Sequence, residues 1–214
     1  MSHRTAILLS LVLLAGSLPV QAGKLGVGVR AGTQGAGAEF GIGVSDRFTL
    51  RAGYYTADLS EDYDDAGIVY DGDLQIGGSG VIADFHPFKG SFHVSAGVFS
   101  NENELTIIAT PTMSEFIGGT LYTPAEIGTL SGEISFDSTA PYFGIGWGRI
   151  TGDKRLGFLF DLGILAQGSG DVVLTSSTGL IDEADLQAEI AEIEADIEDF
   201  DFWPVISFGL AIRF

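Results

Sequence analysis

The stretch Ser207-Phe208-Gly209-Leu210-Ala211-Ile212-Arg213-Phe214 closes the sequence and decides its fold class. Apolar residues occupy positions 208, 210, 212 and 214, and small or polar residues occupy the positions between them. A period of two is the pattern of a β-strand with one apolar face and one polar face. The stretch therefore predicts a strand that separates an apolar from a polar environment.

The same residues resemble the C-terminal signal of bacterial outer-membrane β-barrels. A Gly, an apolar residue and a terminal Phe stand at the positions of that signal, here Gly209, Ile212 and Phe214. The resemblance implies that the barrel assembly machinery recognises this end of the chain. It also implies a location in the bacterial outer membrane.

The beginning of the sequence has the pattern of a secretory leader. Arg4 precedes an apolar run over 6–14, and small residues follow as far as Ala22. This order is typical of a signal peptide, and the run is too short to span a membrane as a helix. We expect residues 1–22 to be removed and 23–214 to form one transmembrane β-barrel domain. A buried core helix is the alternative for the leader.

The composition excludes several classes of function. The 214 residues hold 10 Lys and Arg against 29 Asp and Glu, a net charge of −19, which makes nucleic acid a very poor partner. There is no Cys, which excludes disulfides and thiolate chemistry. The mean hydropathy is +0.30, yet no segment after the leader has 18 uninterrupted apolar residues. This combination fits strands that show lipid only one face.

Alternating residues predict eight strands, at 24–31, 38–44, 48–58, 68–88, 91–108, 132–150, 155–175 and 202–214. Apart from a bend at 32–37, short turns (45–47, 87–90, 151–154) alternate with long loops (59–67, 110–130, 176–200). Outer-membrane barrels place short turns in the periplasm and long loops outside. We therefore expect an eight-stranded antiparallel up-and-down transmembrane β-barrel. A soluble sandwich or lipocalin-like barrel is the alternative, although aromatic residues near the strand ends favour lipid.

In architecture, the chain resembles the small eight-stranded outer-membrane proteins of the OmpA/OmpX/OmpW-like group. The stretch Pro141-Tyr142-Phe143-Gly144-Ile145-Gly146-Trp147-Gly148 is similar to a family of proteobacterial outer-membrane proteins whose molecular role is not defined. These resemblances imply a fold and a location. They do not imply one function, because one fold supports many.

If the apolar alternates face lipid, the charged residues of the strands face the barrel interior. That set is Arg30, Glu39, Arg47, Arg51, Asp84, His86, His93, Asp161 and Arg213. The interior of an eight-stranded barrel is just wide enough to be filled by side chains, and charges there must pair. The mixed signs favour a plug of ion pairs, and a polar path for ions or a small solute is the alternative.

His86 and His93 flank a turn, so hairpin pairing places them opposite each other and places Asp84 opposite Ser95. Such a cluster suggests acyl-transfer chemistry, because some eight-stranded barrels deacylate or acylate lipid A. Those families keep their catalytic residues near the extracellular side, whereas this cluster lies at the turns. We therefore expect a structural role, with no catalytic residue and no cofactor. Two His and one Asp could also bind zinc, and this possibility stays open.

Two of the predicted loops are strongly acidic. Residues 58–73 and 182–201 contain no Lys or Arg. In the second loop Leu186, Ile190, Ile193 and Ile197 have helical spacing, and Asp182 can cap a short amphipathic helix over 182–200. A solvated, repulsive surface is one interpretation. The other is that divalent cations bridge the carboxylates to the phosphates of lipopolysaccharide.

Together these features predict a monomeric, non-catalytic outer-membrane barrel. Its role is structural, that of a surface-interaction module, or that of a narrow conduit for small solutes. The alternative is a lipid A-modifying enzyme. The expected partners are membrane lipid and lipopolysaccharide, through divalent cations, besides the assembly machinery.

The terminal motif gives a test of assembly. Deleting Phe214, or replacing it with Asp, should leave the chain in the periplasm, where it is degraded, because the recognised terminal aromatic is lost. Outer-membrane fractions should then contain little heat-modifiable protein on gels. Wild-type amounts of folded barrel in those fractions would contradict the interpretation of the motif.

Overall fold

The computed structural model describes residues 24–65 and 67–214, so the predicted leader over 1–22 lies outside the described residues. In this part of the chain thirteen strands form most of the fold, and their pairings are antiparallel. Eleven of these strands belong to one large sheet, and two form a small hairpin. The all-β, antiparallel character predicted from the sequence is confirmed.

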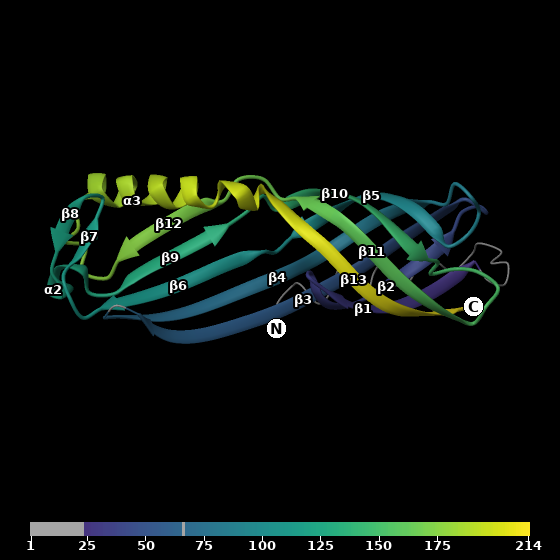
Figure 1. The fold of residues 1–214 in the computed structure, drawn as a ribbon, viewed down its shortest axis with the longest axis horizontal. Coiled ribbons are helices and arrows are strands. Elements are labelled where there is room, and N and C mark those ends of the chain that lie inside the picture. The colour runs from purple at the N-terminus through teal and green to yellow at the C-terminus, as the bar shows by residue number, and fades with distance from the viewer. Residues whose placement is uncertain (1–23, 66) are drawn as a thin grey trace, which may run out of the picture.

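Eight strands close into a ring, which is the barrel (Figure 1). In hydrogen-bonded order they are β4 (Ile68–Phe85), β3 (Phe48–Asp65), β2 (Gly35–Gly43), β1 (Leu25–Gly32), β13 (Phe202–Arg213), β11 (Leu156–Ala166), β10 (Thr139–Gly148) and β5 (Phe92–Asn101), which pairs again with β4. The first and last strands complete the ring, with Val29 opposite Leu210. The connections 44–47, 86–91 and 149–155 lie at one end, which we call the turn end.

At the other end part of the sheet continues past the ring. β4 pairs with β5 over 78–85 and with β6 (Glu104–Pro111) over 68–75. β6 then pairs with β9 (Leu130–Ser135), and β9 pairs with β12 (Asp171–Ser176). With residues 57–65 of β3, these strands form a five-stranded sheet that we call the extension (Figure 1).

The extension corrects several sequence-based boundaries. The predicted fifth, sixth and seventh strands each divide into two, at 102–103, 136–138 and 167–170. The predicted loop at 59–67 is instead the tip of a long hairpin, because β3 and β4 stay paired as far as Asp65 and Ile68. The stacked rings of Tyr63 and Tyr70, 4.8 Å apart, lie in this hairpin. The predicted bend at 32–37 shortens to residues 33–34.

The partner change of β4 occurs at two glycines. Gly77 and Gly78 both have φ of 139°, a conformation that L side chains rarely adopt. A Cβ on Gly78 would lie 1.8 Å from the carbonyl oxygen of Ser100. The strand can therefore leave β5 and join β6 here because neither position carries a side chain.

The predicted loop over 110–130 is also structured. It contains the hairpin of β7 (Glu115–Ile117) and β8 (Thr120–Tyr122), and the short helix α2 (Pro124–Ile127). These elements contribute to a buried apolar cluster, against which Leu186 packs. Its members are Ile117, Tyr122, Ile127 and Ile181.

The last connection holds the predicted helix. α3 spans Glu183–Asp196 and is followed by the 3-10 helix η2 (Glu198–Asp201). Asp182 caps α3 as predicted, its Oδ1 accepting from the backbone N–H of Ala184 at 2.9 Å. The helix runs along β12 at the edge of the extension (Figure 1). None of the helices described here is both long and apolar enough to cross a membrane.

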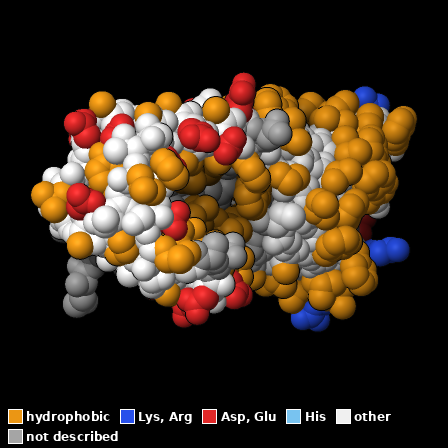
Figure 2. Space-filling model, turned by 60° about the vertical axis from the view of Figure 1, so that its left-hand side comes forward, with side chains coloured by type: hydrophobic (Ala, Val, Ile, Leu, Met, Phe, Trp, Pro, Cys, Tyr) orange, Lys and Arg blue, Asp and Glu red, His pale blue; other side chains and the backbone are white. Residues whose placement is uncertain are grey.

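The orientation of the side chains decides between the membrane and the soluble interpretations. Apolar residues point outward from the ring and are exposed, such as Phe158 (82 %), Phe208 (63 %) and Val29 (60 %). Charged residues point inward and are buried, including Arg51 at 4 %. Figure 2 shows apolar side chains gathered over the ring and acidic ones over the extension. A soluble barrel would have the reverse arrangement, so the ring is built for contact with lipid.

The extension has the opposite arrangement, with an apolar face continuing the barrel interior and a polar face outward. One row of paired residues crosses all five strands on the inner face: Leu59, Leu74, Leu105, Ile134 and Val172. The neighbouring row on the outer face is Asp58, Gln75, Glu104, Ser135 and Asp171. The surface is hollowed beside this part of the molecule (Figure 2). The same sheet therefore passes from a lipid to an aqueous environment.

The docking of α3 can be tested with two matched substitutions. Leu186→Asp should release the start of the helix, because it places a charge against the apolar cluster of Ile117 and Ile127. We expect cleavage within 180–200 by a protease specific for acidic residues to become about ten-fold faster, equivalent to about 1.4 kcal/mol of local opening. Ala188→Asp adds the same charge at an exposed position and should leave the rate unchanged. Equal rates in the two variants would show that Leu186 does not hold the helix.

Candidate functional site

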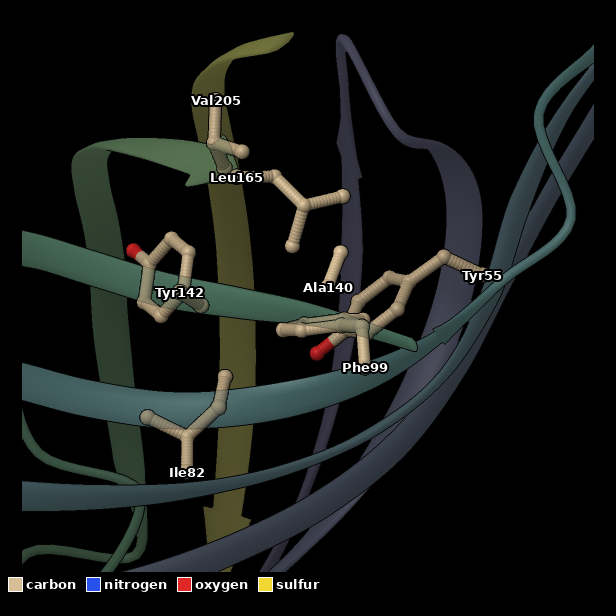
Figure 3. Packing of buried hydrophobic residues seen from close by; sticks show 7 residues of the cluster. All are labelled: Tyr55, Ile82, Phe99, Ala140, Tyr142, Leu165 and Val205. Carbon is tan, nitrogen blue, oxygen red and sulfur yellow. The ribbon is translucent and has the colours of Figure 1, made fainter. Parts of the chain in front are cut away.

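The barrel interior is filled by successive layers of side chains. Nearest the turn end lies a small apolar layer of Ile150, Leu159 and Ala211. A layer of charged residues follows, and a second apolar layer lies beyond it. Figure 3 shows that second layer, which consists of Tyr55, Ile82, Phe99, Ala140, Tyr142, Leu165 and Val205. The charged layer is the candidate site, because titratable groups gather there away from solvent.

Arg51 lies at the centre of the charged layer. Its guanidinium forms a bidentate pair with Asp84, with Nε–Oδ2 at 2.7 Å and Nη2–Oδ1 at 2.8 Å. Its Nη1 also contacts Glu39 Oε2 at 3.1 Å, and its Nη2 contacts Asp161 Oδ1 at 3.3 Å. One arginine therefore joins three carboxylates that come from three different strands.

Arg30 completes the network from the opposite side. Its Nε lies 2.9 Å from Glu39 Oε1, its Nη1 pairs with Asp161, and Nη1 also donates to Ser207 Oγ at 3.1 Å. Glu39 and Asp161 thus each bridge the two arginines. Because buried charges are stable only when paired and hydrogen-bonded, this closed set holds β1, β2, β3, β4 and β11 in register.

Two hydroxyl groups donate to carboxylate oxygens that also contact Arg51. Tyr55 donates to Glu39 Oε2 at 3.0 Å, and Ser95 donates to Asp84 Oδ1 at 2.7 Å. Sequence reasoning missed Tyr55 and Ser207 as members of the network. The alternation of the strands could have revealed both residues, since each lies at an inward-facing position of its strand.

His93 adds an imidazole ring to the charged layer. Its Nε2 lies 2.9 Å from Asp161 Oδ1, and its Nδ1 lies 3.2 Å from the carbonyl oxygen of Ser91. The ring of His93 therefore links Asp161 to the backbone beside the turn end.

A glycine makes room for this contact. A Cβ on Gly146, which is paired with both His93 and Asp161, would lie 2.4 Å from His93 Nε2 and 2.5 Å from Asp161 Oδ1. The alternating glycines of the 141–148 stretch therefore do more than mark a resemblance, since one of them allows the ion pair to close.

The structure brings together six of the predicted interior residues: Arg30, Glu39, Arg51, Asp84, His93 and Asp161. His86 lies at the border of this set, with its ring 5.1 Å from that of His93 and its Nδ1 3.2 Å from the carbonyl oxygen of Phe92.

Two predicted members lie elsewhere, which corrects the sequence-based set. Arg47 is exposed, because it belongs to the turn and not to a strand. Arg213 reaches the turn end and donates to the carbonyl oxygens of Arg149 and Lys154, both at 3.1 Å. At the terminal motif, Gly209 pairs with Arg30, and Ile212 and Phe214 are exposed on the outer surface.

The serine and histidines of the predicted cluster form hydrogen bonds with neighbouring groups. The hydroxyl of Ser95 donates to a carboxylate, His93 contacts Asp161, and His86 contacts a backbone carbonyl. All three side chains are almost fully buried. Over 24–65 and 67–214, no group of three or more His, Cys, Asp or Glu is arranged to hold a metal ion.

A second charged feature lies outside the ring, on the outer face of the extension. A shallow pocket of about 250 Å³ is lined there by residues that include Asp58, Asp73 and Glu104. Farther along the sheet, the carboxylate of Asp62, opposite Asp71, raises the pKa of Asp71 above its usual value. Like charges therefore face each other on this surface.

Comparison with known proteins identifies the fold. No protein-family model matches the sequence, and no curated protein matches it. The structure is similar to that of Acinetobacter baumannii CarO2, with a TM-score of 0.61 and 21% identity over 91% of this chain and 100% of the other. It is equally similar to Acinetobacter baumannii CarO, with a TM-score of 0.60 and 22% identity over 92% and 100% of the two chains.

A weaker likeness is to a major outer membrane protein from Thermus thermophilus, with a TM-score of 0.44 and 15% identity over 89% and 99% of the chains. The two CarO comparisons establish the fold, and the predicted OmpA/OmpX/OmpW-like grouping stays a prediction. A closed barrel with an apolar outer belt is the form in which β-structure spans the bacterial outer membrane. With the CarO-like fold, this belt confirms the predicted location in that membrane.

The charged layer predicts a large effect of removing its central arginine. Arg51→Ala leaves the carboxylates of Glu39, Asp84 and Asp161 without their shared partner and should destabilise the folded barrel by about 3–5 kcal/mol. The urea midpoint of the barrel refolded in lipid vesicles reports this change. Arg47→Ala removes an equal charge from an exposed turn and should leave the midpoint unchanged. An unchanged midpoint in Arg51→Ala would show that the network does not stabilise the fold.

Proposed function

We propose that this chain is a non-catalytic surface-interaction protein of the outer membrane. In this proposal the filled barrel anchors the protein in the membrane, and the acidic extension faces the cell exterior and forms the interaction surface. Its carboxylates hold divalent cations against the phosphates of lipopolysaccharide. The observation that carries the proposal is the separation of charge along the molecule, in which the extension has carboxylates and no Lys or Arg.

This separation is visible in the sequence once the fold is known. No Lys or Arg occurs in 52–88, 90–148 or 156–212, which include the whole extension, α3 and both additional hairpin strands. The same segments carry most of the carboxylates. An acidic surface without its own cations repels itself, as the raised pKa of Asp71 indicates. Divalent cations from solution would relieve this repulsion.

The position of the carboxylates supports lipopolysaccharide as the partner. Asp58 lies on the outer face of β3, four residues beyond Tyr54 of the exposed belt, about 13 Å farther along the strand. Asp73 and Glu104 line the same shallow pocket. Phosphate groups of an outer leaflet would lie at this level. Since no complete metal site is formed by the described residues alone, a bridging cation would share its ligands with the lipid.

The structure gives less support to the two other candidate roles, a conduit for small solutes and a lipid A-modifying enzyme. A conduit needs a continuous path, whereas the ring is filled by one ionic and two apolar layers. A lipid A-modifying enzyme needs its catalytic groups near the substrate, whereas Ser95, His86 and His93 lie toward the turn end. We keep the absence of catalysis as part of the proposal.

The proposal is tested with purified protein in vesicles that contain lipopolysaccharide. Replacing Asp58 and Asp73 with Asn and Glu104 with Gln should weaken Mg²⁺-dependent retention of lipopolysaccharide about ten-fold, equivalent to about 1.4 kcal/mol. Retention is measured by co-purification with and without a chelator.

A matched control places the same loss of charge on the exposed face of α3, with Glu192→Gln, Glu194→Gln and Asp196→Asn. This variant should retain lipopolysaccharide as the wild type does. Wild-type retention that is insensitive to the chelator would contradict cation bridging. Discrete ion conductance by the wild type in planar bilayers would contradict the closed anchor.

A further inference from the structure

The turn end has a charge character opposite to that of the extension. Every Lys and Arg from residue 24 onward, apart from Arg30 and Arg51, lies in or beside its connections. An open cavity of about 650 Å³ occurs there, which we call the vestibule. Its lining includes five basic residues: Lys24, Lys89, Arg149, Lys154 and Arg213.

Carboxylates balance only part of this charge. The vestibule lining contains two acidic residues, Asp46 and Asp153. Asp46 is already paired with Lys89, whose Nζ lies 3.0 Å from Asp46 Oδ2 and keeps the pKa of that carboxyl below its usual value. The remaining lining carries four cations against one carboxylate.

The two arginines are held in place by neutral partners. Arg149 donates to the carbonyl oxygens of Asp46 at 3.1 Å and of Lys89 at 3.3 Å. Arg213 Nε in turn donates to the carbonyl oxygen of Arg149 at 3.1 Å. These bonds fix both guanidinium groups without neutralising them, and partial burial lowers the pKa of Arg149. The vestibule thus has preorganised positive charge.

We propose that the vestibule is a binding site for a phosphate group. Several oxygens on one phosphate can be shared among ammonium and guanidinium donors, which suits a cavity lined by both. Exposed apolar side chains lie near the same end of the barrel, notably Phe88 (80 %), Leu156 (70 %) and Phe158 (82 %). A phospholipid of the adjacent leaflet would place its phosphate in the vestibule and its acyl chains against these residues. Free phosphate is the other source of the same chemistry.

The inference is independent of the role of the extension, because the vestibule and the extension lie at opposite ends of the barrel. Its test uses the full mature protein folded in a phosphate-free maltoside detergent. Short-chain phosphatidylglycerol, short-chain phosphatidylcholine and inorganic phosphate are titrated separately, and binding is followed by calorimetry.

Lys24→Gln with Lys154→Gln removes two exposed cations of the vestibule. This double variant should bind phosphatidylglycerol about ten-fold more weakly than the wild type, equivalent to about 1.4 kcal/mol. Arg47→Gln with Arg155→Gln is the matched control, since both residues are exposed at the turn end but lie outside the vestibule lining. The control pair should bind as the wild type does.

The outcomes separate the ligand sources. Competition by millimolar inorganic phosphate would support the site and assign it to free phosphate, whereas binding of phosphatidylglycerol without such competition would assign it to the lipid headgroup. Equal weakening in the two double variants would overturn the proposal, because the effect would then be the general charge of the turn end. Phosphatidylcholine carries the same phosphate beside a choline cation, so it should bind more weakly than phosphatidylglycerol in this basic cavity. The absence of saturable binding by all three ligands would also overturn the proposal.

Discussion

Charged side chains that point into an eight-stranded ring must be neutralised inside it, because the lumen has room for side chains and little else. Arg51 meets this constraint by contacting Glu39, Asp84 and Asp161 together. Each carboxylate comes from a different strand, so the network can close only when those strands are in one register. Removing any member would leave a buried charge unpaired, which ties the ionic layer to the stability of the whole barrel.

Filling the ring also determines where the molecule can interact with other partners. With its lumen occupied, the barrel presents two chemically different ends to its surroundings. The extension gathers carboxylates on its outer face, and the turn end gathers Lys and Arg around the vestibule. This polarity along one axis is the reason for proposing cation-bridged lipopolysaccharide at one end and a phosphate group at the other.

The extension depends on a single strand that changes partner. β4 leaves β5 at Gly77 and Gly78 and continues with β6, and the inner face stays apolar on both sides of the change. The outer face changes from exposed aliphatic residues such as Val81 to carboxylates such as Asp73. The pairing between β3 and β4 therefore continues unbroken from lipid to water, and the outward side chains change with the solvent.

The sequence alone determined the alternation of the strands, the terminal motif and the capped helix after Asp182, because these are local patterns with a period of two or of 3.6 residues. It also placed Arg30, Glu39, Arg51, Asp84, His93 and Asp161 on inward positions. Local patterns carry no information on which distant side chains meet, so only the tertiary structure showed how these charges pair. It also showed that Arg47 and Arg213 lie outside the charged layer, and that β3 continues through the acidic segment as far as Asp65. It likewise decided the vestibule, because that cavity joins Lys24, just before β1, with Lys89 and Lys154 of two separate connections, and only the closed ring brings these to one end.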